Sequence, residues 1–183
     1  MSKAYVFTAN GCEEVEALTT VDLLRRGGVE TVMVSITEDL QVTGSHGIAF
    51  QADQLFGESD FSDGDALILP GGMPGTLNLQ GDERLLAELK RADAKGSWVC
   101  AICAAPRILG SLGLLKGQKA TCYPGNEQYL EGAEVTGQAA EISGHFVTGK
   151  GAGCAVDFGL ALLSVLEGKE KAEEIARGIQ WQH

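Results

Sequence analysis

Short apolar runs alternate with amphipathic segments along most of the chain. The runs are too short for buried helices and predict strands over residues 4–8, 31–36, 65–70 and 97–102. Apolar positions three or four apart predict helices between them. The predicted helices cover residues 13–26, 82–94, 105–112, 154–166 and 170–179. Strands that alternate with helices indicate an α/β fold around a mostly parallel sheet.

Two weaker patterns complete this picture. Residues 42–50 place a Thr-Gly-Ser-His-Gly turn between two short apolar arms, which predicts a hairpin. Val135 and residues 145–148 are expected to form short strands. The β-α-β start of the chain predicts a right-handed crossover between parallel strands. Ligand sites are then expected at the carboxyl ends of the strands.

The helix over 13–26 is expected to turn an apolar stripe inward. The stripe consists of positions three apart, namely Val15, Leu18, Val21 and Leu24. The first-turn acids Glu13, Glu14 and Glu16 suit the positive end of the helix dipole. Their spacing alone predicts side chains exposed to water.

Cys103 stands where a buried strand meets a helix that has Pro106 in its first turn. Such a turn is a nucleophile elbow, which projects its side chain above the sheet. The helix start is expected to favour the thiolate and make Cys103 reactive near neutral pH. The N–H groups of Gly72 and Ala104 are candidates for an oxyanion hole. A buried structural thiol is the alternative.

Cys100 and Cys103 also match a C-x-x-C pattern. A redox dithiol needs both sulfurs at a helix start, whereas Cys100 lies inside the predicted strand. Neither a second C-x-x-C nor paired histidines supply further zinc ligands, so no metal is expected. The remaining cysteines, Cys12, Cys122 and Cys154, are interpreted as structural or incidental thiols.

No histidine stands in an obvious place for a Cys-His-acid triad. His46 lies in the predicted hairpin turn, His145 precedes a strand, and His183 ends the sequence. The first two are interpreted as surface residues.

Composition narrows the function classes. A length of 183 residues predicts one domain, 1–183. The net charge of −11 argues against nucleic acid as a partner. No apolar run of 18 residues and no signal-peptide pattern are present, which predicts neither a membrane span nor secretion. Five cysteines, an odd number, are expected to be free thiols in a reducing cytoplasm.

Three segments together resemble the ThiJ/PfpI superfamily, and within it the DJ-one-like branch. They are residues 13–16 (Glu-Glu-Val-Glu), 69–72 (Leu-Pro-Gly-Gly) and 101–106 (Ala-Ile-Cys-Ala-Ala-Pro). Residues 151–153, 157–160 and 167–169 fit as well, so the resemblance covers nearly the whole chain. It implies a flavodoxin-like three-layer sandwich, similar to class I glutamine amidotransferases, and a homodimer without a cofactor.

The resemblance also implies roles for individual residues. Cys103 would be hydrogen-bonded to a protonated Glu16, which reverses the solvent-exposed interpretation of that acid. Gly72 and Ala104 match the oxyanion donors, and Gly71 belongs to the same glycine motif. His46 falls on a basic residue that approaches the site from the second subunit. Arg26 matches a residue near that dimer contact.

The chain departs from the family pattern at three positions. Tyr123 replaces a common histidine, and Ala152 replaces a proline of the late glycine loop. Ala104 stands where the protease-like relatives carry histidine, so a peptidase is not expected.

The function expected from the resemblance is a cysteine-dependent enzyme for small aldehydes or glycated substrates, similar to glutathione-independent glyoxalases and deglycases. The alternative is an oxidative-stress sensor or redox-regulated chaperone without turnover. Isonitrile or amide hydrolysis is a third possibility, because one fold hosts many chemistries.

Overall fold

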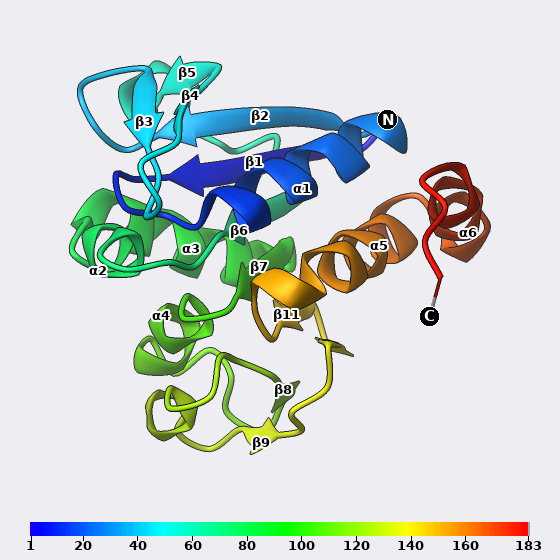
Figure 1. Cartoon of the computed structure of the whole chain (residues 1–183). Helices are drawn as coiled ribbons and strands as arrows, with labels where there is room; N and C mark the ends of the chain where they lie inside the picture. The colour runs from blue at the N-terminus through cyan, green and yellow to red at the C-terminus, as the bar shows by residue number, and fades with distance from the viewer. Residues whose placement is uncertain (183) are drawn as a thin grey trace.

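In the computed structural model, which describes residues 1–182, a seven-stranded sheet runs through the centre of the molecule (Figure 1). In spatial order its strands are β10 (Ala140–Ser143), β11 (Phe146–Gly149), β7 (Trp98–Ile102), β6 (Ala66–Leu69), β1 (Lys3–Thr8), β2 (Glu30–Ser35) and β5 (Gln54–Leu55). Only β10 runs antiparallel to its neighbour. The strands predicted from the apolar runs are all present, with ends shifted by one or two residues.

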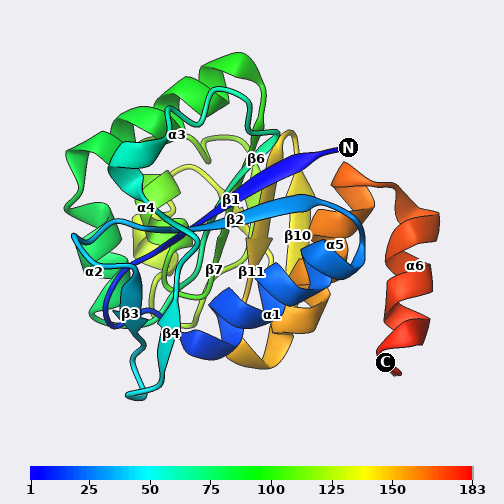
Figure 2. The same ribbon diagram turned by 90° about the horizontal axis from the view of Figure 1, so that it is seen from above.

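Helices cover both faces of the sheet (Figure 2). One face carries α2 (Gly75–Gln80), α3 (Glu83–Lys95) and α4 (Pro106–Ser111). The other carries α1 (Glu14–Arg26), α5 (Ala155–Leu166) and α6 (Lys169–Gly178). Each face has its own buried apolar cluster, and the sheet separates the two.

The order of the parallel strands identifies the topology. Counted along the chain without the two-residue edge strand β5, they lie in the order 2-1-3-4-5. This is the flavodoxin-like order of a doubly wound sheet, and the predicted three-layer sandwich is confirmed. In such sheets ligands bind where the strand order reverses, which here is the gap between the carboxyl ends of β1 and β6.

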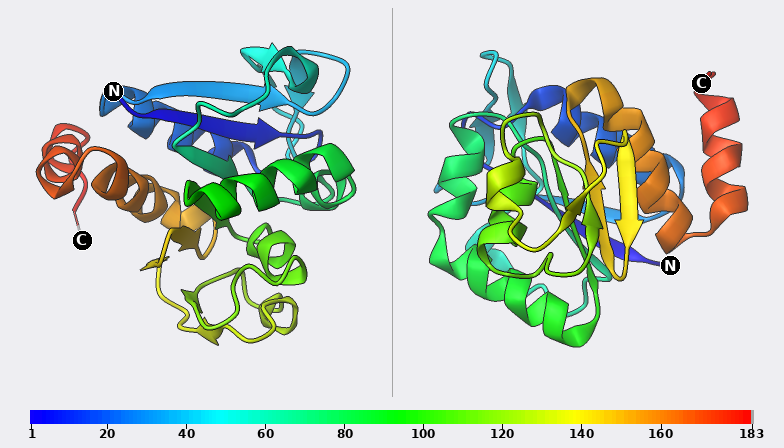
Figure 3. Two further views of the ribbon diagram at one scale, coloured as in Figure 1. Left: turned by 180° about the vertical axis from the view of Figure 1, so that it is seen from behind. Right: turned by 90° about the horizontal axis from the view of Figure 1, so that it is seen from below.

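Two small sheets lie outside the central one. The predicted hairpin is present as β3 (Gln41–Thr43) and β4 (Ala49–Gln51). Its turn end is joined to the loop after β1, because Gly11 N–H donates to Thr43 O and Ser45 N–H donates to Cys12 O, both at 2.8 Å. Strands β8 (Lys119–Ala120) and β9 (Glu134–Val135) pair at the opposite end, visible from behind and below in Figure 3.

Helix α1 corrects the predicted apolar stripe. Val21 and Leu24 are buried, but Val15 is 51% exposed and Leu18 is 37% exposed. A spacing of three falls about 60° short of a full turn at each step, so positions 15 and 24 lie on opposite sides of a helix. The buried side includes Glu16 instead, with the consequences described below.

Among residues 1–182 we find no helix with both the length and the apolar composition that crossing a membrane requires.

Candidate active site

A pocket of about 640 Å³ opens at the carboxyl ends of the parallel strands. Seven residues singled out from the sequence line it: Glu16, His46, Gly72, Cys103, Ala104, Tyr123 and Ala152. Five further lining residues were not predicted: Glu13, Ser45, Met73, Pro124 and Asn126. The second group lies in turns, where no periodic pattern marks which side chains face inward. The available signal was their position within the family motif (Glu13) or within a few residues of predicted site residues (the other four).

Cys103 has the geometry of a nucleophile elbow. Its φ is 66°, in the left-handed region that a residue with a side chain rarely adopts. The surrounding backbone holds this conformation, since Cys103 N–H donates to Gly149 O at 2.9 Å and Cys103 O accepts from Tyr123 N–H at 2.7 Å. The chain then enters α4 with Pro106 at its start. Backbone strain held in this way is common at functional sites.

Glu16 lies beside Cys103 and is fully buried, so the solvent-exposed interpretation is wrong. Its Oε2 accepts a hydrogen bond from Gly71 N–H at 2.8 Å. Its Oε1 is buried too and has no conventional hydrogen-bond partner in the described part of the chain. A methyl group placed on Gly71 would lie 2.6 Å from Cys103 Cβ and 2.8 Å from Glu16 Oε2. Only a glycine leaves room for the two side chains to meet.

The environment of Glu16 favours its protonated form. Burial raises the pKa of the Glu16 carboxyl to about 7. Hydrogen bonds with Gly71 N–H and with Cys103 act to lower this pKa but do not outweigh burial. An acid with such a pKa can both donate and accept a proton near neutral pH.

The Cys103 thiol does not match the low pKa expected from the helix start. Burial, followed by the negative charge of Glu16, raises the pKa of Cys103 to about 12. Hydrogen bonds from the N–H groups of Gly72 and Ala104 oppose this shift but are too weak to outweigh it. The thiol, with Glu16 close by, is therefore the resting form. A proton on Glu16 removes the repulsion between the two groups.

Gly72 and Ala104 direct their N–H groups at the Cys103 sulfur. Gly72 has a φ of 87°, and its Cα packs so closely on the loop after β1 that an added Cβ would lie 2.3 Å from Glu13 N. The oxyanion hole stays a prediction, which these two donors support.

Glu14 anchors the hairpin to the start of α1. Its Oε1 accepts from the backbone N–H of His46 at 2.7 Å and of Ile48 at 3.3 Å. Its Oε2 lies 3.2 Å from His46 Nδ1. Burial acts to raise the pKa of Glu14, but backbone donors and the His46 ring outweigh it and lower the pKa to about 2. Glu14, only 3% exposed, is a second buried acid where the sequence predicted an exposed one.

His46 lies at the pocket rim within the same chain, between the carboxylates of Glu13 and Glu14. These three residues bring ligand atoms within 4.8 Å of one another, which makes them the group in the described chain most able to contact a cation. Both Glu14 oxygens are already used by the hairpin. His145 is distant from this group and pairs with Asp93 at 2.8 Å, while His183 lies outside the described residues.

The other cysteines do not share the position of Cys103. Cys100 is fully buried in β7, within the apolar cluster beneath α1 and α5, as the strand interpretation of the C-x-x-C pattern requires. Cys12 and Cys122 are buried, and Cys154 is partly exposed. Burial raises the pKa of all four. All five cysteines are free.

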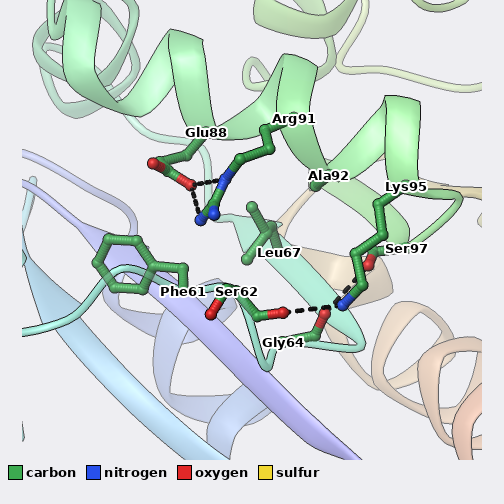
Figure 4. A pocket seen from close by; sticks show the side chains of 9 residues that line it. All are labelled: Phe61, Ser62, Gly64, Leu67, Glu88, Arg91, Ala92, Lys95 and Ser97. Atoms are coloured by element: carbon green, nitrogen blue, oxygen red, sulfur yellow. Dashed lines mark hydrogen bonds and ion pairs between the residues drawn. The ribbon is translucent and has the colours of Figure 1, made fainter.

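A second hollow of about 60 Å³ lies between α3 and the turn before β6 (Figure 4). Its cations are already engaged, because Arg91 pairs with Glu88 and Lys95 Nζ donates to Ser62 O at 2.9 Å. Its lining holds no cysteine and no histidine, so the pocket at Cys103 is the better candidate.

Comparison with known proteins places this chain in a family. The DJ-1/PfpI family model matches residues 2–165. Protein DJ-1 homolog B of Arabidopsis thaliana is 38% identical over 95% of the chain. The chain spans less than half of the length of this relative and of its homolog A (40% and 44%).

Two further matches cover most of both proteins. A protein named a deglycase from Pyrococcus horikoshii is 34% identical over 76% of this chain and 83% of its own length. The solved structure of oxidized Toxoplasma gondii DJ-1 superposes with a TM-score of 0.96 at 34% identity, covering 100% of both chains. The chain belongs to the DJ-1/PfpI family, in its DJ-1-like branch.

Proposed function

We propose that this protein is a cysteine-dependent enzyme that converts small reactive carbonyl compounds, as glyoxalases and deglycases do. One observation carries the proposal: Cys103 and the buried Glu16 lie side by side in one pocket, beneath the N–H groups of Gly72 and Ala104. The similarity to a protein named a deglycase supports the same reaction class.

The chemistry starts with addition of the Cys103 sulfur to the aldehyde carbon of a 2-oxoaldehyde such as methylglyoxal. A sulfur–carbon bond forms, the carbonyl electron pair moves to oxygen, and the thiol proton ends on that oxygen as a hemithioacetal. The N–H groups of Gly72 and Ala104 stabilise the negative charge that develops there.

Glu16 then moves a proton between two carbons. Its carboxylate removes the hydrogen from the carbon bonded to sulfur and returns it to the neighbouring carbon. The hydroxyl proton of the hemithioacetal passes to the ketone oxygen, which leaves a thioester of lactate. Water cleaves the sulfur–carbon bond of the thioester, releasing lactate and the thiol. A carboxyl pKa of about 7 allows Glu16 to accept the proton and to give it back at neutral pH.

Methylglyoxal consumption and lactate formation by the purified protein test the proposal. We expect Cys103→Ser and Glu16→Gln each to abolish lactate formation while the fold is retained. Cys154→Ser is the matched control, because Cys154 is the other partly exposed thiol and does not line the pocket. Lactate formed equally by Cys103→Ser would refute the proposal.

Oxidation of Cys103 is the second candidate function. The same N–H donors and the Glu16 acid could hold the oxygens of a cysteine sulfinate, which two equivalents of peroxide form with release of two waters. Selective addition of two oxygens, seen by intact mass and absent in Cys103→Ser, is the expected result. Oxidation spread over all five cysteines would contradict a sensor role.

We further infer that residues 1–183 act as one domain and as a homodimer in the cytoplasm. Strands from both ends of the chain share one sheet, which supports the single domain. The exposed Val15 and Leu18 offer apolar surface on α1. Arg26, paired with Asp22, lines the same surface hollow as Leu18. Sedimentation of the wild type and of Leu18→Glu tests the dimer, which the added charge is expected to weaken. The net charge of −11 supports the expectation that nucleic acid is not a partner.

A further inference from the structure

The pocket over Cys103 is far larger than methylglyoxal requires. Its volume of about 640 Å³ is in the range of sites that take drug-sized ligands. Its lining includes the apolar or aromatic residues Met73, Tyr123, Pro124 and Ala152. It also includes the polar residues Glu13, Ser45 and His46.

Tyr123 is the largest of these apolar or aromatic lining residues. Its backbone is fixed to the elbow by the hydrogen bond from Tyr123 N–H to Cys103 O at 2.7 Å. The ring stands over Gly151, where an added Cβ would lie 3.3 Å from Tyr123 Cδ2. The side chain is nevertheless 53% exposed, and within residues 1–182 its hydroxyl makes no hydrogen bond. A half-exposed ring on a backbone that is fixed beside a nucleophile is suited to stack on a flat apolar group.

The acidic residues around the pocket disfavour anions. Glu13 lines the pocket, and the buried Glu14 carboxylate accepts from the backbone N–H of the rim residue His46. The His46 ring lies within 3.3 Å of the carboxylates of Glu13 and Glu14 and is already engaged by them. A second negative charge brought by a substrate would therefore meet unfavourable electrostatics.

We propose that the pocket selects uncharged carbonyl compounds with an aromatic substituent, the arylglyoxal class, and that Tyr123 is the specificity-determining residue. The carbonyl lies at Cys103, the aromatic group stacks on the Tyr123 ring, and carboxylate-bearing carbonyls are disfavoured. This inference rests on the proposed function only in taking Cys103 as the reacting group.

Three bromomethyl ketones test the selection without requiring turnover. Bromoacetone, phenacyl bromide and bromopyruvate share a reacting CH2Br carbon, and they carry a methyl, a phenyl and a carboxylate group on the carbonyl carbon next to it. In each case the Cys103 sulfur forms a bond to that carbon, bromide leaves, and the thiol proton goes to solvent. Rate constants are measured by mass spectrometry of the Cys103 peptide and divided by those for free cysteine.

The expected order is phenacyl bromide first, then bromoacetone, then bromopyruvate. Tyr123→Ala should lower the phenyl-to-methyl ratio about fivefold, which is within the range that one stacked aromatic pair contributes. Tyr123→Phe should keep the ratio, because the ring and not the hydroxyl makes the contact. Tyr129→Ala is the matched control, since Tyr129 is 37% exposed but lies outside the pocket. Glu13→Gln should raise the relative rate of bromopyruvate.

A phenyl-to-methyl ratio that is the same in the wild type and in Tyr123→Ala overturns the inference. The result is separable from the test of enzymatic activity. A protein that forms no lactate but keeps the Tyr123-dependent ratio refutes the proposed function alone. Lactate formation with no effect of Tyr123 refutes this inference alone.

Discussion

The first turn of α1 carries two buried carboxyl groups that face opposite surroundings. Glu14 points to the hairpin, where the backbone N–H groups of His46 and Ile48 donate hydrogen bonds to it and its pKa falls to about 2. Glu16 points to the elbow, where Gly71 N–H bonds one oxygen and burial raises its pKa to about 7. The number of donors decides the outcome, because both side chains are almost completely buried.

This difference separates structural from chemical roles. A carboxylate surrounded by N–H donors stays ionised at physiological pH and holds two segments together. A carboxyl with a free oxygen beside a thiol can exchange a proton. The hairpin side of the turn is therefore interpreted as structural support, and the elbow side as the reacting part of the site.

The largest expected effect comes from the pH dependence of Glu16. Its folded pKa lies above the unfolded value of 4.5, so the folded protein binds more protons between pH 4.5 and 7 and this contribution to stability is lost as pH rises. Glu16→Gln has no titrating group at this position, so the variant does not lose this stability as pH rises. Between pH 4.5 and 7.5 the variant should gain up to about 3 kcal/mol of unfolding free energy relative to the wild type. Guanidinium unfolding at both pH values measures the gain, and a pH-independent difference would contradict it.

Gly71→Ala is expected to have the next largest effect, because it damages the elbow side alone. The new methyl would lie 2.6 Å from Cys103 Cβ and 2.8 Å from Glu16 Oε2. Forcing these groups apart should cost about 1–3 kcal/mol and disrupt the reacting pair. Chemical unfolding, together with alkylation of Cys103, measures both effects. Gly57→Ala is the control, since an added Cβ there meets nothing within 4 Å. Equal losses in the two variants would show that packing at Gly71 is not special.

Glu14→Gln tests the hairpin side. The variant loses the negative charge that accepts hydrogen bonds from the His46 and Ile48 N–H groups. We expect the free energy of unfolding to fall by about 1.5–2 kcal/mol at pH 7. In the wild type the Glu14 contribution has the opposite pH dependence to that of Glu16, because it is complete above pH 4.5 and is lost as pH falls toward 2. Urea unfolding at pH 7 checks the cost, with Glu13→Gln as the neighbouring control. A loss no larger than that of Glu13→Gln would reduce Glu14 to an ordinary surface acid.

The same turn shows how far the sequence could be used. The short apolar runs predicted β1, β2, β6 and β7 because a buried strand needs only continuous apolar residues. The strand-to-helix junction also predicted where Cys103 would project. The burial of Glu14 and Glu16 could not be read from the helix pattern, since their neighbours are loops from residues 44–48 and 71–72. The family resemblance supplied Glu16, but nothing in the sequence indicated that Glu14 holds the hairpin.

Removing the His46 side chain is expected to have the smallest effect on stability. It separates the two contacts of His46 with Glu14, one through the backbone N–H and one through the ring. The backbone N–H of His46 donates to Glu14 Oε1 at 2.7 Å, whereas the ring is 70% exposed and 3.2 Å from Oε2. His46→Ala keeps the backbone bond and removes only an exposed ion pair, which contributes less than about 1 kcal/mol. Urea unfolding of this variant beside Glu14→Gln measures the difference. If His46→Ala were as damaging as Glu14→Gln, the ring would hold the hairpin, and the contrast between the two acids would rest on one side chain instead of on backbone donors.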